Sequence, residues 1–223
     1  MPQGFSEMGL VEKPTLSLLQ TLGYEVVDAY NESYGPSSPS TGNPGRDDRS
    51  EVILRHRLRP KLAELNPDLP PQALDQALEQ LVLDRTAMDR VRASQAVWKL
   101  LRNGAKATFT ADDGGRETET VRLVDWRDPA ANDFLAVSQL WITGPLHTRR
   151  TDIICFVNGI PLALLELKAS HKSAKEAYDK NLTDYRDTIP QLFTPNGLVI
   201  LSTGSETKVE PPRVGWRRSL LSF

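Results

Sequence analysis

Apolar and polar positions recur along this chain with two different periods, which indicates a fold that combines helices and strands. Apolar residues three or four positions apart predict four helices in the first half, at residues 14–22, at 50–65, from Pro70-Pro71 through Leu81, and in a segment that ends near Gly104. Pro14 suits the first helical position, and Gly23 is placed to end the first helix.

Short runs of β-branched and aliphatic residues predict strands between and after these helices. The runs lie at residues 24–29, 106–110, 120–126, 134–142, 153–157, 162–167 and 198–202. The second and third form a hairpin with its turn at residues 112–115. A capping-box pattern at Ser173 and Glu176 predicts a helix that carries Tyr185 and ends at Pro190. This order predicts an α/β fold, a mixed sheet flanked by helices with additional helices on the amino-terminal side.

Two segments lack any such period. Residues 35–49 are rich in turn formers and poor in apolar residues, so we predict a mobile loop that does not pack. Its glycines lack the lysine of a phosphate-binding loop, and no ATP site is expected. Residues 209–223, interrupted by Pro211-Pro212 and Gly215, predict a disordered tail.

The composition is typical of a soluble enzyme domain. The chain has 223 residues, 39% hydrophobic and 25% charged, enough for one core and a small appended lobe. The single cysteine, Cys155, lies in an apolar run, which indicates a core residue in a reducing compartment. No secretory signal pattern is present, and no apolar run approaches the ~18 residues of a membrane span. We therefore expect a cytoplasmic protein.

The most informative pattern is the pair of apolar runs at 153–157 and 162–167, joined through Asn158-Gly159, a strong signal for a β-hairpin. A two-residue loop would place Asp152 opposite Leu165, and Asp152 and Glu166 would then lie on opposite faces of the sheet. A three-residue loop, 158–160, would place Asp152 opposite Glu166. Lys168 would share that face, because strand side chains alternate.

The second register predicts a cluster of Asp152, Glu166 and Lys168, which suits a hard divalent cation such as Mg2+. Two carboxylates at this distance repel, so either one is protonated or a cation lies between them. Lys168 could then orient or help deprotonate a water molecule at the metal and stabilise charge on a phosphate, as in phosphodiester hydrolysis. The alternative is a strand end where Glu166 and Lys168 form an exposed ion pair.

Positive charge gathers around this cluster, although the net charge of the chain is −2. Two arginines precede the cluster and three lysines follow it: Arg149, Arg150, Lys172, Lys175 and Lys180. They predict a local basic track for phosphate contacts. The alternative for each is a solvated, charged helix face.

Asp152 followed by Glu166-Leu167-Lys168 across an apolar hairpin resembles the core of PD-(D/E)xK nucleases, and residues 149–168 as a whole resemble the R subunit of type I restriction endonucleases. The resemblance extends over about residues 7–208, and the segments that carry it outside the hairpin are 66–70, 121–126, 132–139, 189–193 and 196–197.

The resemblance implies a restriction-endonuclease-like PD-(D/E)xK fold and roles for individual residues. Asp152 and Glu166 would bind Mg2+, together with the carbonyl of Leu167, and Lys168 would serve the attacking water. The family's Gln-x-x-x-Tyr motif corresponds to Asn181 and Tyr185, where the shorter asparagine puts the contact to DNA or to the site in doubt. A glutamate on the first helix would be Glu12 or Glu7. Arg150, Lys172 and Lys175 would contact DNA.

The resemblance also implies a type I site-specific deoxyribonuclease that cuts double-stranded DNA, with methyltransferase and specificity subunits as partners. Translocation would be driven by ATP in regions of the full-length subunit, and these translocase regions are expected to be absent here. We expect an amino-terminal nuclease domain, 1–208, from a split or disrupted gene. The alternative is a noncatalytic or vestigial docking module, which the Asn181 substitution favours.

Overall fold

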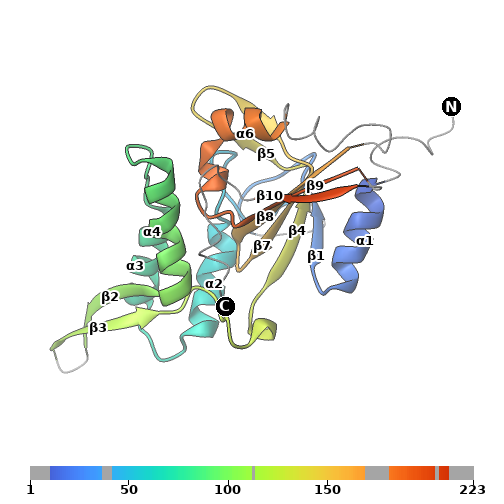
Figure 1. Cartoon of the computed structure of the whole chain (residues 1–223). Coiled ribbons are helices and arrows are strands. Elements are labelled where there is room, and N and C mark those ends of the chain that lie inside the picture. Colours follow the sequence, from blue (N-terminus) through green and yellow to red (C-terminus); the bar gives the residue numbers. More distant parts are fainter. Residues whose placement is uncertain (1–10, 37–41, 112–113, 169–180, 204–205, 211–223) are drawn as a thin grey trace, which may run out of the picture.

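A computed structural model describes residues 11–36, 42–111, 114–168, 181–203 and 206–210 (Figure 1). Its centre is a six-stranded mixed sheet in the order β1-β4-β7-β8-β9-β10. The strands are Glu25–Asp28 (β1), Phe134–Ser138 (β4), Ile153–Val157 (β7), Ile160–Leu167 (β8), Leu198–Ser202 (β9) and Thr207–Glu210 (β10). The β1/β4 and β8/β9 pairs are parallel, and the others are antiparallel. The predicted mixed sheet flanked by helices is confirmed.

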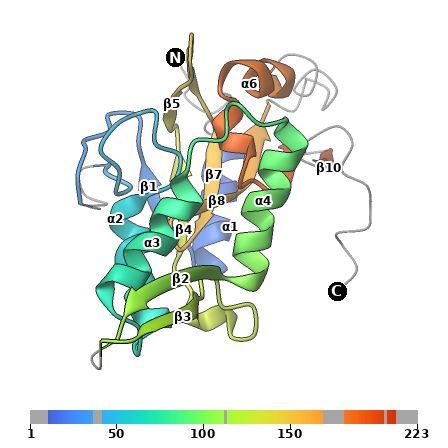
Figure 2. The ribbon, with the colours of Figure 1, turned by 90° about the vertical axis from the view of Figure 1, so that its left-hand side faces the viewer.

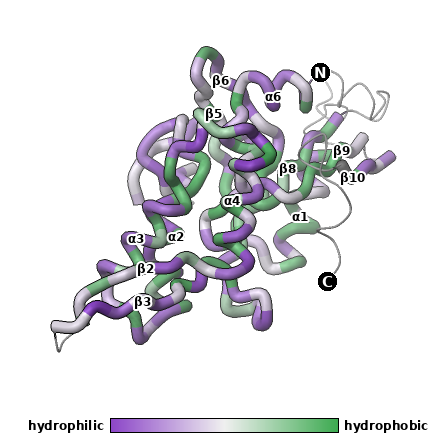
Figure 3. The backbone as a smooth tube through the Cα atoms, turned by 60° about the vertical axis from the view of Figure 1, so that its left-hand side comes forward, coloured by the Kyte–Doolittle hydropathy of each residue, from purple (hydrophilic) through white to green (hydrophobic). Residues whose placement is uncertain are grey.

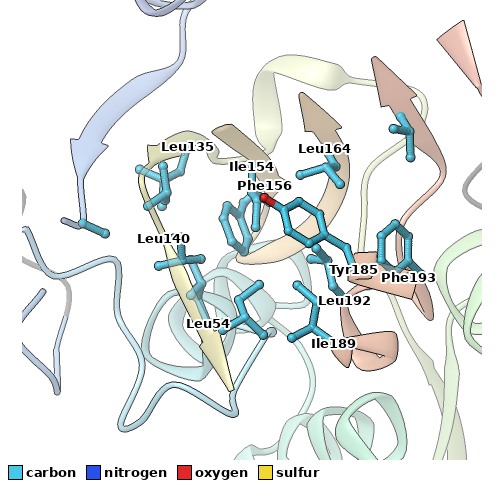
Figure 4. Packing of buried hydrophobic residues seen from close by; sticks show 14 of the residues in the cluster. Leu54, Leu135, Leu140, Ile154, Phe156, Leu164, Tyr185, Ile189, Leu192 and Phe193 are labelled. Atoms are coloured by element: carbon cyan, nitrogen blue, oxygen red, sulfur yellow. The ribbon is translucent and has the colours of Figure 1, made fainter. Parts of the chain in front are cut away.

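Each face of this sheet packs against a different helix. Leu19 of α1 (Lys13–Thr21) packs on the face that carries Ile153 and Leu165. The opposite face packs on α6 (Thr183–Thr188) and the short helix η6 (Pro190–Phe193). Figure 4 shows Tyr185 and Phe193 among the apolar residues of that layer. Alternating side chains on β7 and β8 supply both cores, as expected for a sheet covered on two sides.

A second group of elements packs beside the sheet, at the left of Figure 1. It contains α2 (Arg55–Leu65), α3 (Pro71–Val82), α4 (Arg90–Asn103) and the hairpin of β2 (Ala105–Thr110) and β3 (Arg116–Val121). These elements share a second hydrophobic core, and Figure 2 shows them side by side. In Figure 3 hydrophobic (green) and hydrophilic (purple) stretches alternate along the tube of these helices. The start of β8 joins this core through Ile160, so the group packs directly on the central sheet.

The predicted elements differ from the observed ones mainly at their ends. The helix predicted from residue 50 begins at Arg55, and the strand predicted at 120–126 lies at Arg116–Val121. The strand predicted at 134–142 is interrupted at Gln139, which has a positive φ of 56°. It forms β4 and then β5 (Trp141–Thr143), which pairs with β6 (Thr148–Arg150). We did not predict β10. Among the described residues, no helix is long and apolar enough to span a membrane.

The expectation that residues 35–49 do not pack is wrong for Asn43 and Arg46, which are buried. Arg46 forms a fully buried ion pair with Glu32 at 2.6 Å and donates to the backbone carbonyls of Glu51 and Trp141. This segment packs through polar contacts instead of apolar ones. Burial of the Arg46 guanidinium is possible because its N–H donors have partners. The prediction of a disordered tail from residue 209 is wrong for Val209 and Glu210, which belong to β10 and pair with β9. Residues 37–41 and 211–223 lie outside the described residues.

The β7–β8 hairpin combines both predicted registers. Its loop contains two residues, Asn158 and Gly159, both with positive φ, and the predicted three-residue loop is wrong. Near the loop Val157 pairs with Ile160, but beyond a β-bulge the register shifts by one, and Ile153 pairs with Leu165. The extra residue lies on β8 next to Pro161, which cannot donate a ladder hydrogen bond. Continuing this register places Asp152 opposite Glu166.

Candidate functional site

The site lies at the edge of the sheet where β8 ends and β7 begins. Asp152 directly precedes β7, Glu166 and Leu167 end β8, and Lys168 follows. The Leu167 backbone N–H donates a 2.7 Å hydrogen bond to Oδ2 of Asp152. The bulge therefore brings the three predicted residues Asp152, Glu166 and Lys168 to one face.

Glu166 is at the centre of this group and is almost fully buried, with 1% of its side chain exposed. Its Oε1 accepts a 2.7 Å hydrogen bond from Nζ of Lys168 and a second bond from the side-chain amide of Asn181. Nζ of Lys168 also donates to the Leu167 carbonyl at 3.0 Å. The Glu166–Lys168 pair is thus buried, and the alternative of an exposed ion pair at a strand end is wrong.

The environment of Glu166 opposes its ionisation. Burial, followed by repulsion from Asp152, raises the pKa of Glu166 from 4.5 to about 7, although Lys168 and Asn181 lower it. A carboxyl group that is half protonated near neutral pH can readily release its proton to solvent when a metal cation binds it. A positive charge next to the two acids would favour the ionised form of Glu166, as Lys168 already does.

The donor set fits a hard divalent cation. Among the described residues, Oε2 of Glu166 is buried and has no hydrogen-bond partner, so one carboxylate oxygen is available to a ligand. Asp152 and the Leu167 carbonyl lie beside it. The same residues contain no group of three or more His, Cys, Asp or Glu side chains that could hold a metal. Two carboxylates, a carbonyl and water are the ligands that Mg2+ commonly takes.

Glu12, one of the two predicted amino-terminal glutamates, lies close to this pair, at the start of α1. It is buried, and its Oε2 accepts a 2.8 Å hydrogen bond from the side-chain amide of Gln139. Burial raises the pKa of Glu12, and repulsion from Asp152 and Asp28 adds to the effect. The other candidate, Glu7, lies outside the described residues.

The short helix α6 brings Tyr185 to the site, and Asn181 reaches it from just before that helix. The amide of Asn181 contacts Glu166, so the shorter side chain does reach the acid pair. The hydroxyl of Tyr185 donates to the Arg150 carbonyl at 2.7 Å, and Arg149 forms an ion pair with Asp184. These two contacts hold α6 against β6. Burial raises the pKa of Tyr185 well above its usual range, so the phenol stays protonated.

The predicted basic track is described only in part. Arg150 is exposed beside the acids, whereas Lys172, Lys175 and Lys180 lie outside the described residues. Cys155 is buried, and desolvation raises its pKa to about 12, in agreement with a core role.

Sequence reasoning missed Gln139, which holds Glu12. Its signal was the polar Ser138-Gln139 step inside an apolar run. The aromatic residues Tyr30 and Trp141, which contact Arg150, were also missed and gave no sequence signal.

Fold and site thus define a mixed α/β domain with a buried acid pair and a lysine at one sheet edge. The family model for the N terminus of the type I restriction enzyme R protein matches residues 4–210. The chain therefore belongs to this family.

Two relatives agree with this assignment. The chain is 35% identical over 198 residues to the Type I restriction enzyme HindI endonuclease subunit of Haemophilus influenzae, with 87% of this chain and 18% of that protein covered. It is 29% identical over 220 residues to the "Putative type I restriction enzyme MjaIXP endonuclease subunit" of Methanocaldococcus jannaschii, with 94% and 20% covered. The chain spans about a fifth of the length of these relatives.

Proposed function

We propose that the chain is a Mg2+-dependent DNA endonuclease domain with a PD-(D/E)xK fold. One observation carries the proposal: Asp152, Glu166 and Lys168 meet at one sheet edge, and Oε2 of Glu166 is buried without a partner in the described part of the chain. The hairpin of β7 and β8, flanked by helices on both faces, supports the fold assignment.

Asp152 and Glu166 would hold the ion, with the Leu167 carbonyl as a third ligand. Bound Mg2+ would supply positive charge that makes a water molecule more acidic and offsets charge on a phosphate. Lys168 would orient the attacking water and stabilise the developing charge on the phosphate. Its ammonium already lies 2.7 Å from Oε1 of Glu166, which fixes the position of that charge. Asn181 orients Glu166 through the same oxygen.

Family membership supports the rest of the proposal. The substrate would be double-stranded DNA, and the partners would be the methyltransferase and specificity subunits of a type I complex. Cleavage would be coupled to ATP-driven translocation by regions of a longer subunit. We place such a complex in the cytoplasm.

The experiment combines Mg2+ calorimetry with plasmid nicking on the same samples. The chain is compared with Asp152→Ala, Lys168→Met and a matched control, Asp68→Asn, an exposed acid in the link between α2 and α3. We expect Asp152→Ala to lose Mg2+ binding and the control to keep it. Lys168→Met should keep DNA binding but lose nicking.

Binding of Mg2+ that survives in Asp152→Ala would refute the metal site. Binding without nicking would favour the alternative of a noncatalytic module. The hydrogen bond from the Asn181 amide to Glu166 supports the catalytic proposal over that alternative.

A further inference from the structure

Two arginines and two aromatic rings form a ladder beside the acid pair. The guanidinium carbon of Arg150 lies 5.2 Å from the ring centroid of Tyr30 and 5.4 Å from that of Trp141. The guanidinium carbon of Arg49 lies 5.5 Å from the same Trp141 ring. These residues come from three segments of the chain: the turn after β1, the segment before α2, and the β5–β6 hairpin. We call this group the arginine–aromatic ladder.

The ladder leaves its guanidinium groups open to solvent. Arg49 and Arg150 are both exposed, as is Tyr30 at 50%. Within the described part of the chain, neither guanidinium forms an ion pair or donates a hydrogen bond. Arg46 and Arg149 differ, because carboxylates occupy both. The rings hold two cations in place through their faces, so the N–H edges remain available.

The ladder is continuous with the candidate site. Arg150 lies two residues before Asp152 in the chain, and its charge lowers the pKa of Glu12, which Asp152 raises. The hydroxyl of Tyr185 donates a hydrogen bond to the backbone carbonyl of Arg150. In Figure 1, β5 lies beside α6, while the β2–β3 hairpin lies at the far side of the molecule.

We infer that the arginine–aromatic ladder binds backbone phosphates of the DNA next to the bond that is cut, one phosphate for each arginine. This inference rests on the proposed function for the identity of its ligand. Planar guanidinium groups bind phosphate oxygens through paired N–H donors, and stacking on aromatic rings lowers the entropy lost on binding. Such contacts set the position of a duplex and carry no sequence preference.

The test measures binding of a short fluorescent DNA duplex by the full chain in EDTA, over a series of salt concentrations. The variants are Arg49→Gln, Arg150→Gln, their double variant, and Arg116→Gln as a control. Arg116 is exposed and opens β3, away from the site. Each ladder variant should weaken binding, and the slope of log K against log salt should become shallower by about 1. In the double variant this slope should become shallower by about 2, and the slope of the control should match that of the parent.

A variant of the shared ring distinguishes the role of the aromatic residues, which position the arginines, from that of the arginines, which contact phosphate. Trp141→Leu leaves both guanidinium groups but removes the ring that they share. It should weaken binding while the salt slope stays near that of the parent, because both cations can still reach a phosphate.

Two results would overturn the inference: no measurable binding of the duplex by the parent chain at low salt, or salt slopes of the arginine variants equal to that of Arg116→Gln. Failure of the proposed nuclease looks different. In that case Mg2+ binding and nicking are absent, yet the duplex is bound with a slope that depends on Arg49 and Arg150.

Discussion

The backbone N–H of Leu167 donates a 2.7 Å hydrogen bond to the Asp152 carboxylate across the β7–β8 hairpin. Asp152 directly precedes β7, and Leu167 is the last residue of β8. The bond therefore requires the register that pairs Ile153 with Leu165 beyond the bulge. The geometry of the acid pair is therefore set by the backbone of the hairpin, and the side chains that surround it set its charge.

The stability of the metal-free chain should depend on pH through Glu166. Its pKa in the folded chain, about 7, is above the ordinary value of 4.5. The stabilising contribution of the protonated group is complete below pH 4.5 and is lost as pH rises through 7. The loss is on the order of 3 kcal/mol at most. Glu166→Gln should remove this dependence and be more stable than the parent at pH 8.

Urea unfolding in EDTA, followed by tryptophan fluorescence at several pH values, measures this difference. Comparing the two proteins cancels the titration of other groups, including Glu12. Parallel curves for the parent and Glu166→Gln from pH 5 to pH 8 would contradict the raised pKa.

Mg2+ affinity should increase with pH for the same reason. A cation that binds Glu166 competes with the proton on that carboxyl group, so affinity should rise from pH 5 to about pH 7 and then level off. Calorimetry in two buffers with different ionisation enthalpies should detect proton release at pH 6 and little at pH 8. The exposed-acid control Asp68→Asn should behave as the parent does. An affinity that is constant over this range would place the ion elsewhere.

Asn181 should affect the charge of Glu166 more than the fold. Its amide donates to Oε1 of Glu166 and lowers the pKa of that group. Asn181→Ala should raise this pKa further and weaken Mg2+ binding near neutral pH. The lost hydrogen bond to a charged acceptor should lower the free energy of unfolding by about 1.5–3 kcal/mol. Asn181→Gln, which keeps a side-chain amide at this position, should recover much of the affinity. If Asn181→Ala bound Mg2+ as tightly as the parent, the contact would have no role in the site.

The sequence was sufficient for the hairpin and its acids, because Asn158-Gly159 between apolar runs is a local signal. It left the register open, because the bulge depends on how β8 pairs with β9 on its other side as well as with β7. Pro161 is present in the sequence of β8, and a proline in a central strand is compatible with a β-bulge.

Contacts between distant segments could not be predicted. Gln139 lies 127 residues from Glu12, and Arg150 contacts Tyr30, which follows β1, a strand paired with β4. Neither contact follows from the period of apolar positions. The buried Arg46 was missed for the related reason that a polar segment can pack when its donors are satisfied by distant carbonyls.

Gly144 should be required for the position of α6. It follows β5, and a Cβ atom at this position would lie 1.9 Å from the backbone carbonyl oxygen of Thr188, at the end of α6. Backbone cannot yield as a flexible side chain can, so Gly144→Ala should reduce the free energy of unfolding by about 1–3 kcal/mol.

The same displacement should reach the site, because α6 carries Tyr185. Mg2+ binding by the folded fraction of Gly144→Ala should therefore be weaker than in the parent. Leu146→Ala is the matched control, since Leu146 lies in the same turn and is 87% exposed. It should change stability by no more than about 0.5 kcal/mol. Equal unfolding free energies for Gly144→Ala and Leu146→Ala would show that β5 and α6 are not in close contact.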